Sequence, residues 1–176
     1  MSKQRGAVQY GKAIEDSNKT IALDPNNTFA YNNRGYAYDK KGQYGRAIED
    51  YNKAIALDPN NAYAYYNRGL AYYNKGQYDR AIEDYNRAIA INPNDVNAYM
   101  VRGLAYAGKG QYDRAIEDYN KAIAINPNDA GGYFVRGLVY AMKGNMGSSA
   151  ISDLQKACDM GNENGCKALK MVLENR

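Results

Sequence analysis

The chain has 176 residues, of which 45% are hydrophobic and 24% are charged, and its formal net charge is +4. This length allows one or two compact domains, and the absence of an apolar run of about 18 residues argues against membrane insertion. Because the positive charge is mild and not gathered in one block, nucleic-acid binding is not expected. The sequence has no histidine, which argues against most proton-shuttling enzymes and histidine-rich metal sites.

The first predicted element is one amphipathic helix within residues 7–27, ended by Pro25. Basic residues precede it, but no apolar stretch with a cleavage site does, so an intact secretory signal is not expected. Apolar side chains recur along the helix; they are Val8, Ile14, Ile21 and Leu23.

Three nearly identical units of 34 residues follow without a gap, at residues 28–61, 62–95 and 96–129. Each unit carries two apolar stripes with the period of a helix. In the second unit the stripes are Tyr65, Gly69 and Tyr72, then Ala81, Tyr85, Ala88 and Ile89. A repeat of this length is typical of helical hairpins, so each unit is predicted to be two helices joined by a tight turn.

Glycine, proline and asparagine predict where the helices of the second unit end. Gly76 is a natural left-handed cap for the first helix. Pro93 cannot continue the second helix and biases the residue before it away from helical geometry. Asn94 or Asp95 can cap the helix that follows.

An arginine followed by a glycine recurs in every predicted first helix. Four such arginines, buried and unpaired, would rival the roughly 5–15 kcal/mol that stabilises a whole domain. We therefore predict partly wet ion pairs between Arg34 and Asp50, Arg68 and Asp84, Arg102 and Asp118, and Arg136 and Asp153. Asp16 has the same position in the first element, which has no arginine. The alternative is a row of arginines that grips an acidic partner.

The glycine after each arginine lies in the middle of a predicted helix; the four are Gly35, Gly69, Gly103 and Gly137. Each glycine costs about 1 kcal/mol relative to alanine. We expect close approach of the second helix through Ala47, Ala81 and Ala115 to offset this cost.

The last part of the chain departs from the repeat. Residues 130–161 are predicted to be a fourth, divergent hairpin, in which GNMGSSA is one residue longer than the matching GQYDRA, so this turn should differ. Residues 162–176 should form a capping helix over that hairpin. The whole chain, residues 1–176, is treated as a single repeat domain.

The spacing resembles the tetratricopeptide repeat pattern, W-x2-L-G-x2-Y-x8-A-x3-F-x2-A-x4-P. In the second unit the matching residues are Tyr65, Arg68, Gly69, Tyr72, Ala81, Tyr85, Ala88 and Pro93. The resemblance covers about residues 7–160 and implies an all-α, right-handed superhelical solenoid of stacked antiparallel helical hairpins. Residues 7–27 then correspond to the second helix of a partial repeat, with Ser17 and Thr20 at its aromatic and alanine positions.

Proteins of this family are usually scaffolds that hold a peptide or a partner protein in a concave groove lined by the first helices. Tyr36, Tyr63, Tyr66 and Tyr73 are not required by the repeat. In the second unit, Tyr63, Tyr66 and Tyr73 lie opposite the core stripe of the helix. By family analogy we predict a peptide-binding groove formed by Phe29, Asn32, Asn33, Tyr36, Tyr63, Tyr66, Asn67, Leu70, Tyr73, Met100, Leu104, Phe134 and Leu138. The alternative is that the tyrosines only cover a solvated face.

The run KACDMGNENGC resembles the bacterial, cysteine-rich Sel-like repeats, a related family of helical hairpins. In that family two cysteines join the helices, which implies a disulfide between Cys158 and Cys166. Alternatively, Cys158 is a small buried thiol, since it takes the position of Ile55 in the repeat. The compartment decides between these readings. We expect a cytoplasmic protein, or a periplasmic or secreted one if a signal segment was removed and the cysteines pair.

These features predict a non-catalytic protein that needs no cofactor and no metal, because the acidic residues recur with the repeat and two cysteines make no zinc site. Its partner is expected to be a peptide or a protein. The alternative function is a self-assembling structural module, a weak homodimer that associates through the incomplete N-terminal repeat.

Overall fold

The computed structural model describes residues 2–144 and 147–174, with side chains from residue 8 onward. These residues form ten helices and no strand, which confirms the all-α prediction. The chain divides into two compact units, Met1–Pro93 and Asn94–Arg176. Among the described helices, none combines the length and the apolar character needed to cross a bilayer.

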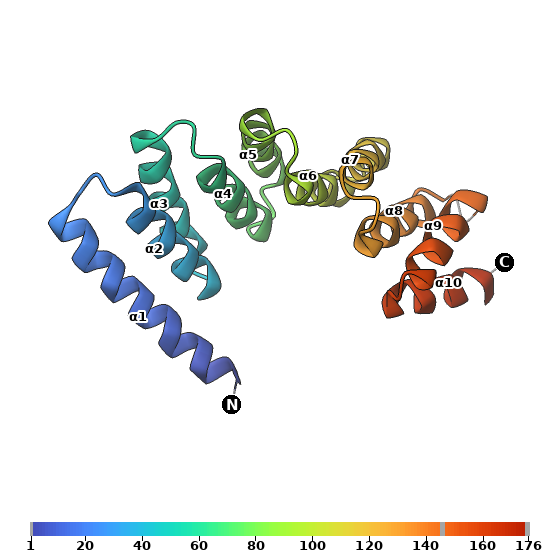
Figure 1. The fold of residues 1–176 in the computed structure, drawn as a ribbon, viewed down its shortest axis with the longest axis horizontal. Coiled ribbons are helices and arrows are strands. Elements are labelled where there is room, and N and C mark those ends of the chain that lie inside the picture. The colour runs from blue at the N-terminus through green and yellow to red at the C-terminus, as the bar shows by residue number, and fades with distance from the viewer. Residues whose placement is uncertain (1, 145–146, 175–176) are drawn as a thin grey trace. The chain divides into compact units, whose positions relative to one another are not determined.

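In the first unit each helix packs mainly against its neighbours along the chain (Figure 1). Its helices are α1 (Ser2–Leu23), α2 (Thr28–Lys40), α3 (Tyr44–Leu57), α4 (Ala62–Asn74) and α5 (Tyr78–Ile91). The pairs α2–α3 and α4–α5 are the two complete hairpins of this unit, as the repeat predicts. α1 begins at Ser2, earlier than the predicted start at residue 7. No proline occurs in residues 2–6 to oppose this extension.

The second unit is built in the same way. Its helices are α6 (Val96–Gly108), α7 (Tyr112–Ile125), α8 (Ala130–Met142), α9 (Ser148–Asp159) and α10 (Glu163–Glu174). The pairs α6–α7 and α8–α9 are hairpins, and α10 packs against α9 and also meets α8. The longer turn predicted in the fourth hairpin falls partly on residues 145 and 146, which lie outside the described residues.

The predicted helix ends are confirmed. Gly76 has a φ of +71°, the left-handed conformation that favours glycine at a helix end. Asp95 accepts hydrogen bonds from the backbone N–H groups of Asn97 and Ala98, and thereby caps α6. α5 ends at Ile91, ahead of Pro93.

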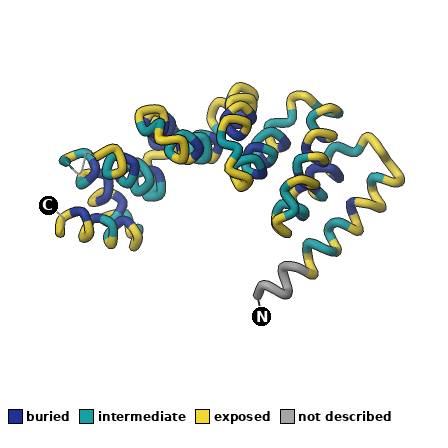
Figure 2. The backbone as a smooth tube through the Cα atoms, turned by 180° about the vertical axis from the view of Figure 1, so that it is seen from behind, coloured by how far each residue is buried: buried dark blue, intermediate teal, exposed yellow. Residues whose placement is uncertain are grey.

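Small residues let the helices of the first unit pack closely. Ala47 and Ala54 of α3 are fully buried, and so are Ala64 and Ala71 of α4. Figure 2 shows the buried positions along the sides where neighbouring helices meet, whereas α1 is mostly exposed or half-buried. In this unit the first helices α2 and α4 are therefore each covered on two sides, by the second helix before it and by the second helix of its own hairpin.

The last two helices are joined covalently. The sulfurs of Cys158 in α9 and Cys166 in α10 are bonded, with 4.6 Å between the two Cα atoms. Beside them Leu154 of α9 forms a buried cluster with Leu169 and Val172 of α10. α10 is thus fixed on the last hairpin both by packing and by this bond.

Candidate binding surface

The recurring arginine forms a two-pronged ion pair inside each hairpin. In the second repeat, Arg68 Nε lies 2.9 Å from Asp84 Oδ2 and Arg68 Nη2 lies 2.6 Å from Asp84 Oδ1. The side chain of Arg68 is 19% exposed and that of Asp84 is 5% exposed. The same pairing joins Arg34 to Asp50, Arg102 to Asp118 and Arg136 to Asp153. All four predicted partly wet pairs are confirmed.

Each arginine in these pairs also has contacts that the sequence reading did not foresee. Arg68 Nη1 donates to Asn52 Oδ1 of α3 at 2.7 Å, and its guanidinium lies 5.5 Å from the centre of the Tyr65 ring. Arg34 bonds Asn18 of α1 in the same way, and Arg136 bonds Asn120. The available signal is the asparagine two residues after Asp16, Asp50, Asp84 and Asp118. Each of these three arginines thus ties its own hairpin to the preceding second helix.

These contacts keep the arginines charged and occupied. Hydrogen bonding to Asp84 raises the pKa of Arg68, and Asp50 does the same for Arg34. A guanidinium held by a carboxylate, an amide oxygen and a tyrosine ring has few donors left for a ligand. We conclude that this row of arginines is architectural.

In the three complete repeats the glycine after the arginine makes room for a tyrosine ring, and Gly137 makes room for Leu154. The prediction that close approach of alanines offsets the cost of these glycines was wrong. A Cβ atom on Gly69 would lie 2.5 Å from the Tyr85 ring, and one on Gly35 would lie 2.8 Å from the Tyr51 ring. Tyr51 and Tyr85 are fully buried. The flat ring needs the bare backbone beside it, and its burial offsets the helix propensity that glycine loses.

Exposed aromatic rings remain on the first helices of the first unit. Phe29 is 77% exposed, Tyr63 at the matching position of α4 is 52% exposed, and Tyr36 is 39% exposed. Leu70, which matches Tyr36, is half-buried. We call the surface formed by Phe29, Tyr36, Tyr63 and Leu70 the first-helix face.

Two predicted groove residues do not lie on an open surface. Asn32 is 3% exposed and Asn67 is 4% exposed. Asn67 lies between Ala64 and Ala71, the small residues through which α4 packs against α3. A peptide therefore cannot reach these amides, whereas Asn33 is exposed because it lies beside the smaller side chains of α1.

Tyr66 and Tyr73, also predicted for the groove, are partly used by the fold. The Tyr66 ring lies 6.2 Å from the buried Tyr85 ring, and the Tyr73 ring lies 5.3 Å from that of Tyr78, centre to centre. Burial raises the pKa of the Tyr73 hydroxyl. These two rings border the first-helix face, but their loss would also disturb the hairpin.

In the second unit, three of the four predicted groove residues are half-buried: Met100, Phe134 and Leu138. Phe134 and Leu138 of α8 pack against the Leu154 cluster, in which α10 takes part. Met100 packs against the core of the α6–α7 hairpin. Leu104 is exposed. Phe134 and Leu138 are therefore half-buried beside a cluster to which α10 contributes Leu169 and Val172.

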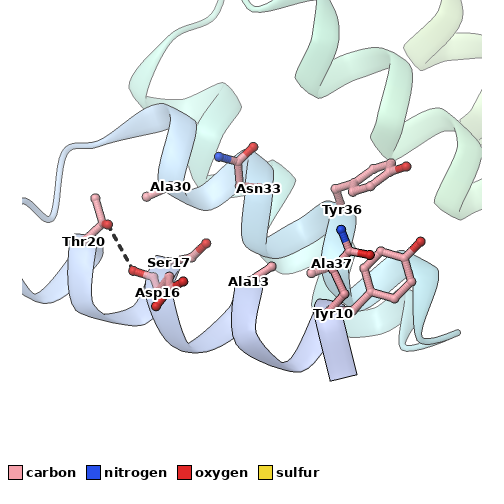
Figure 3. Close-up of a pocket in the computed structure, with 10 residues that line it drawn as sticks. Tyr10, Ala13, Asp16, Ser17, Thr20, Ala30, Asn33, Tyr36 and Ala37 are labelled. Atoms are coloured by element: carbon pink, nitrogen blue, oxygen red, sulfur yellow. Dashed lines mark hydrogen bonds between the residues drawn. The ribbon is translucent and has the colours of Figure 1, made fainter. Parts of the chain in front are cut away.

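A pocket that the sequence reading missed lies between α1 and α2 (Figure 3). It has a volume of about 410 Å³. Tyr10 and Tyr36 meet edge to face on one side, with ring centres 6.5 Å apart. Asp16 and Ser17 of α1 line it, together with Gln9, Ala13, Thr20, Ala30, Asn33 and Ala37.

The first unit also holds a half-buried carboxylate, that of Asp39 in α2. Burial raises the pKa of Asp39, and the neighbouring charge of Lys40, 3.8 Å away, acts in the opposite direction. No group of three or more His, Cys, Asp and Glu side chains suited to a metal ion occurs in residues 8–144 and 147–174. The geometry is that of an aromatic surface with a pocket at one end.

Comparison with protein families identifies the repeat. The model described as "Tetratricopeptide repeat" matches residues 66–130 and 100–164, and related models match residues 40–76 and 18–49. A comparison with curated proteins gives no match.

Solved structures share the fold over most of the chain. The crystal structure of MamA is 34% identical, with a TM-score of 0.82, and the match covers 92% of this chain and 94% of that one. YrrB, described as a TPR protein with an unusual peptide-binding site, is 26% identical, with a TM-score of 0.78 and coverage of 92% and 84%. The first TPR of Spaghetti (RPAP3), bound to the HSP90 peptide SRMEEVD, is 28% identical, with a TM-score of 0.63 and coverage of 65% and 91%.

Proposed function

The chain belongs to the tetratricopeptide repeat family, and on this premise we propose that it is a non-catalytic scaffold whose first-helix face binds a peptide segment of a partner protein. The observation that carries the proposal is the exposure of Phe29, Tyr36 and Tyr63 on two consecutive first helices. The repeat requires none of these rings for packing. Exposed aromatic side chains gathered on one surface are typical of binding sites.

Related structures support this kind of partner. YrrB is described as having a peptide-binding site, and the RPAP3 repeat is bound to a peptide. In this chain the first-helix face offers rings and an aliphatic side chain, whereas the arginines are held by aspartates. The partner segment is therefore expected to bind mainly through apolar side chains and not through a terminal carboxylate.

The test is a peptide-array screen followed by affinity measurements on the best peptide. Replacing Phe29 and Tyr63 by alanine should weaken binding at least about tenfold, because aromatic side chains often carry most of the binding energy. The melting temperature should stay nearly unchanged, since both rings are exposed. Tyr66 and Tyr73 are less suitable for this substitution, because both contact tyrosine rings of α5 and their loss would also affect stability.

Leu23→Ala is the matched control for this test, because Leu23 is an exposed apolar residue of α1 outside the first-helix face. It should leave the affinity unchanged. An unaltered affinity in the Phe29→Ala, Tyr63→Ala variant would exclude the first-helix face as the binding site.

A second candidate function is self-assembly through α1. This helix leaves Val8 and Leu23 largely exposed and packs mainly against α2. Light scattering over a range of concentrations should then show a mass that rises toward the dimer, and Val8→Asp with Leu23→Asp should abolish the rise. A constant monomer mass would exclude this function.

A further inference from the structure

The pocket between α1 and α2 lies where the repeat is incomplete. In complete hairpins a first helix supplies an arginine and a glycine to two consecutive residues of the second helix, as Arg68 and Gly69 do to Asp84 and Tyr85. The corresponding residues of α1 are Asp16 and Ser17. Both line the pocket (Figure 3).

Asp16 is accessible, unlike its equivalents. Its side chain is 59% exposed, whereas those of Asp50 and Asp84 are 7% and 5% exposed. The cation paired with it is Lys19, at 3.8 Å on the same exposed helix surface, and such a pair is weak. A carboxylate that binds arginine in the complete hairpins is thus available at this end of the first unit.

Ser17 leaves space that a ring fills elsewhere. Tyr51 and Tyr85 occupy the corresponding positions, and their rings lie within 3 Å of where a Cβ on Gly35 or Gly69 would be. A serine has no ring, and Ser17, which is itself only 7% exposed, lines the pocket together with the small side chains of Ala13 and Ala37. A helix docked against α1 would therefore need a large apolar side chain at the position where the complete hairpins have glycine.

We infer that this pocket binds a helical segment of a partner protein that carries an arginine followed directly by a large apolar residue. The arginine pairs with Asp16, and the apolar side chain fills the space above Ser17 against Tyr10 and Tyr36. The pocket lies at the α1 end of the first-helix face, so the inference rests on the proposed function and specifies one part of the partner.

The charge and shape of the pocket favour a different protein over a second copy of this chain. Every arginine here that has a following residue precedes a glycine or an alanine. A first helix from another copy could pair with Asp16, but it would leave the space above Ser17 unfilled. A partner whose large apolar side chain fills this space gains the binding energy of burying that side chain, which a glycine or an alanine does not provide.

The test uses three synthetic peptides based on residues 28–40, TFAYNNRGYAYDK. The first keeps this sequence, the second carries Gly35→Phe, and the third carries Gly35→Phe with Arg34→Gln. Fluorescence anisotropy of labelled peptides gives their affinities for the full chain. The Phe peptide should bind about tenfold more tightly than the unchanged peptide, and the Gln substitution should weaken it about fivefold.

Variants of the protein then locate the binding. Ser17→Tyr restores the ring found in complete repeats and should abolish the preference for the Phe peptide, with the helical content unchanged. Asp16→Asn should weaken the Arg-containing Phe peptide but not its Gln counterpart. The Phe29→Ala, Tyr63→Ala variant should leave these affinities unaltered, so failure of the pocket and failure of the first-helix face are distinguishable.

Several outcomes would overturn the inference. They are the absence of measurable binding, equal affinity for the Phe and unchanged peptides, and a preference that survives Ser17→Tyr. Self-association that Ser17→Tyr abolishes would show that a second copy occupies the pocket, and would likewise overturn it.

Discussion

Helices α1 and α5 are both second helices of the repeat, yet the same two consecutive positions have different surroundings in the two helices. In α5, Asp84 is held by Arg68, and the ring of Tyr85 lies against Gly69. In α1, Asp16 is exposed and Ser17 borders a pocket. The comparison teaches that the carboxylate is structural where a first helix covers it and accessible where none does.

The first helices differ in a similar way. α2 exposes Tyr36, whereas Leu138, at the matching position of α8, is half-buried against a cluster that α10 shares. In the second unit the capping helix thus takes part in covering a position that the first unit exposes. Equivalent positions of a repeat therefore take on structural or binding roles according to what covers them.

The strongest test of this difference breaks one buried ion pair. Arg68→Met leaves Asp84 buried without its cation and should lower the free energy of unfolding by about 3 kcal/mol, measured by urea denaturation. The double variant Arg68→Met, Asp84→Leu should recover most of this loss, because two apolar side chains need no partner. A double variant as unstable as the single one would contradict the account of the pair.

A smaller effect is expected from alanine at two helical glycines. Gly69→Ala should destabilise the fold by about 1–2 kcal/mol, because the new Cβ would lie 2.5 Å from the Tyr85 ring. Gly11→Ala in α1 should instead stabilise it by up to about 1 kcal/mol, because nothing lies within 4 Å of the added atom. Thermal unfolding of both variants checks the opposite signs, and a shared sign would contradict the comparison.

The smallest expected effect concerns Asp39. Burial raises the pKa of Asp39 in the folded state. As pH rises, Asp39 therefore ionises in the unfolded chain before it ionises in the folded one, and above the raised pKa it destabilises the fold. Asp39→Asn should therefore stabilise the protein by less than about 1 kcal/mol at pH 7. The gain should shrink as pH falls through the raised pKa. Urea denaturation at pH 7 and pH 3.5 measures it, and a gain that grows in acid would contradict the assignment.

The hairpins and the ion pairs could be predicted from the sequence because both depend on local spacing. An arginine at position 68 can reach few carboxylates other than those sixteen residues later in the same hairpin, so the pairing with Asp84 followed from the register. The turn at Gly76 was equally local.

The surface was harder to predict. The helical period places Asn67 away from the core stripe of α4. However, α4 is also covered on its other side by α3, and Asn67 is buried there. The sequence could not show that Phe134 and Leu138 share a cluster with α10, because that depends on the path of the chain after α9. The pocket was missed because its signal is a substitution, Ser17 in a tyrosine position.

The most direct measurement compares Asp84→Asn with Asp16→Asn, two identical substitutions at the same position of the repeat. Urea denaturation at pH 7 should show a loss of about 2–3 kcal/mol in the free energy of unfolding for Asp84→Asn, because Arg68 loses its carboxylate. Asp16→Asn should change it by less than about 0.5 kcal/mol. Similar losses in the two variants would show that Asp16 is also structural and would contradict the distinction drawn between α1 and the complete repeats.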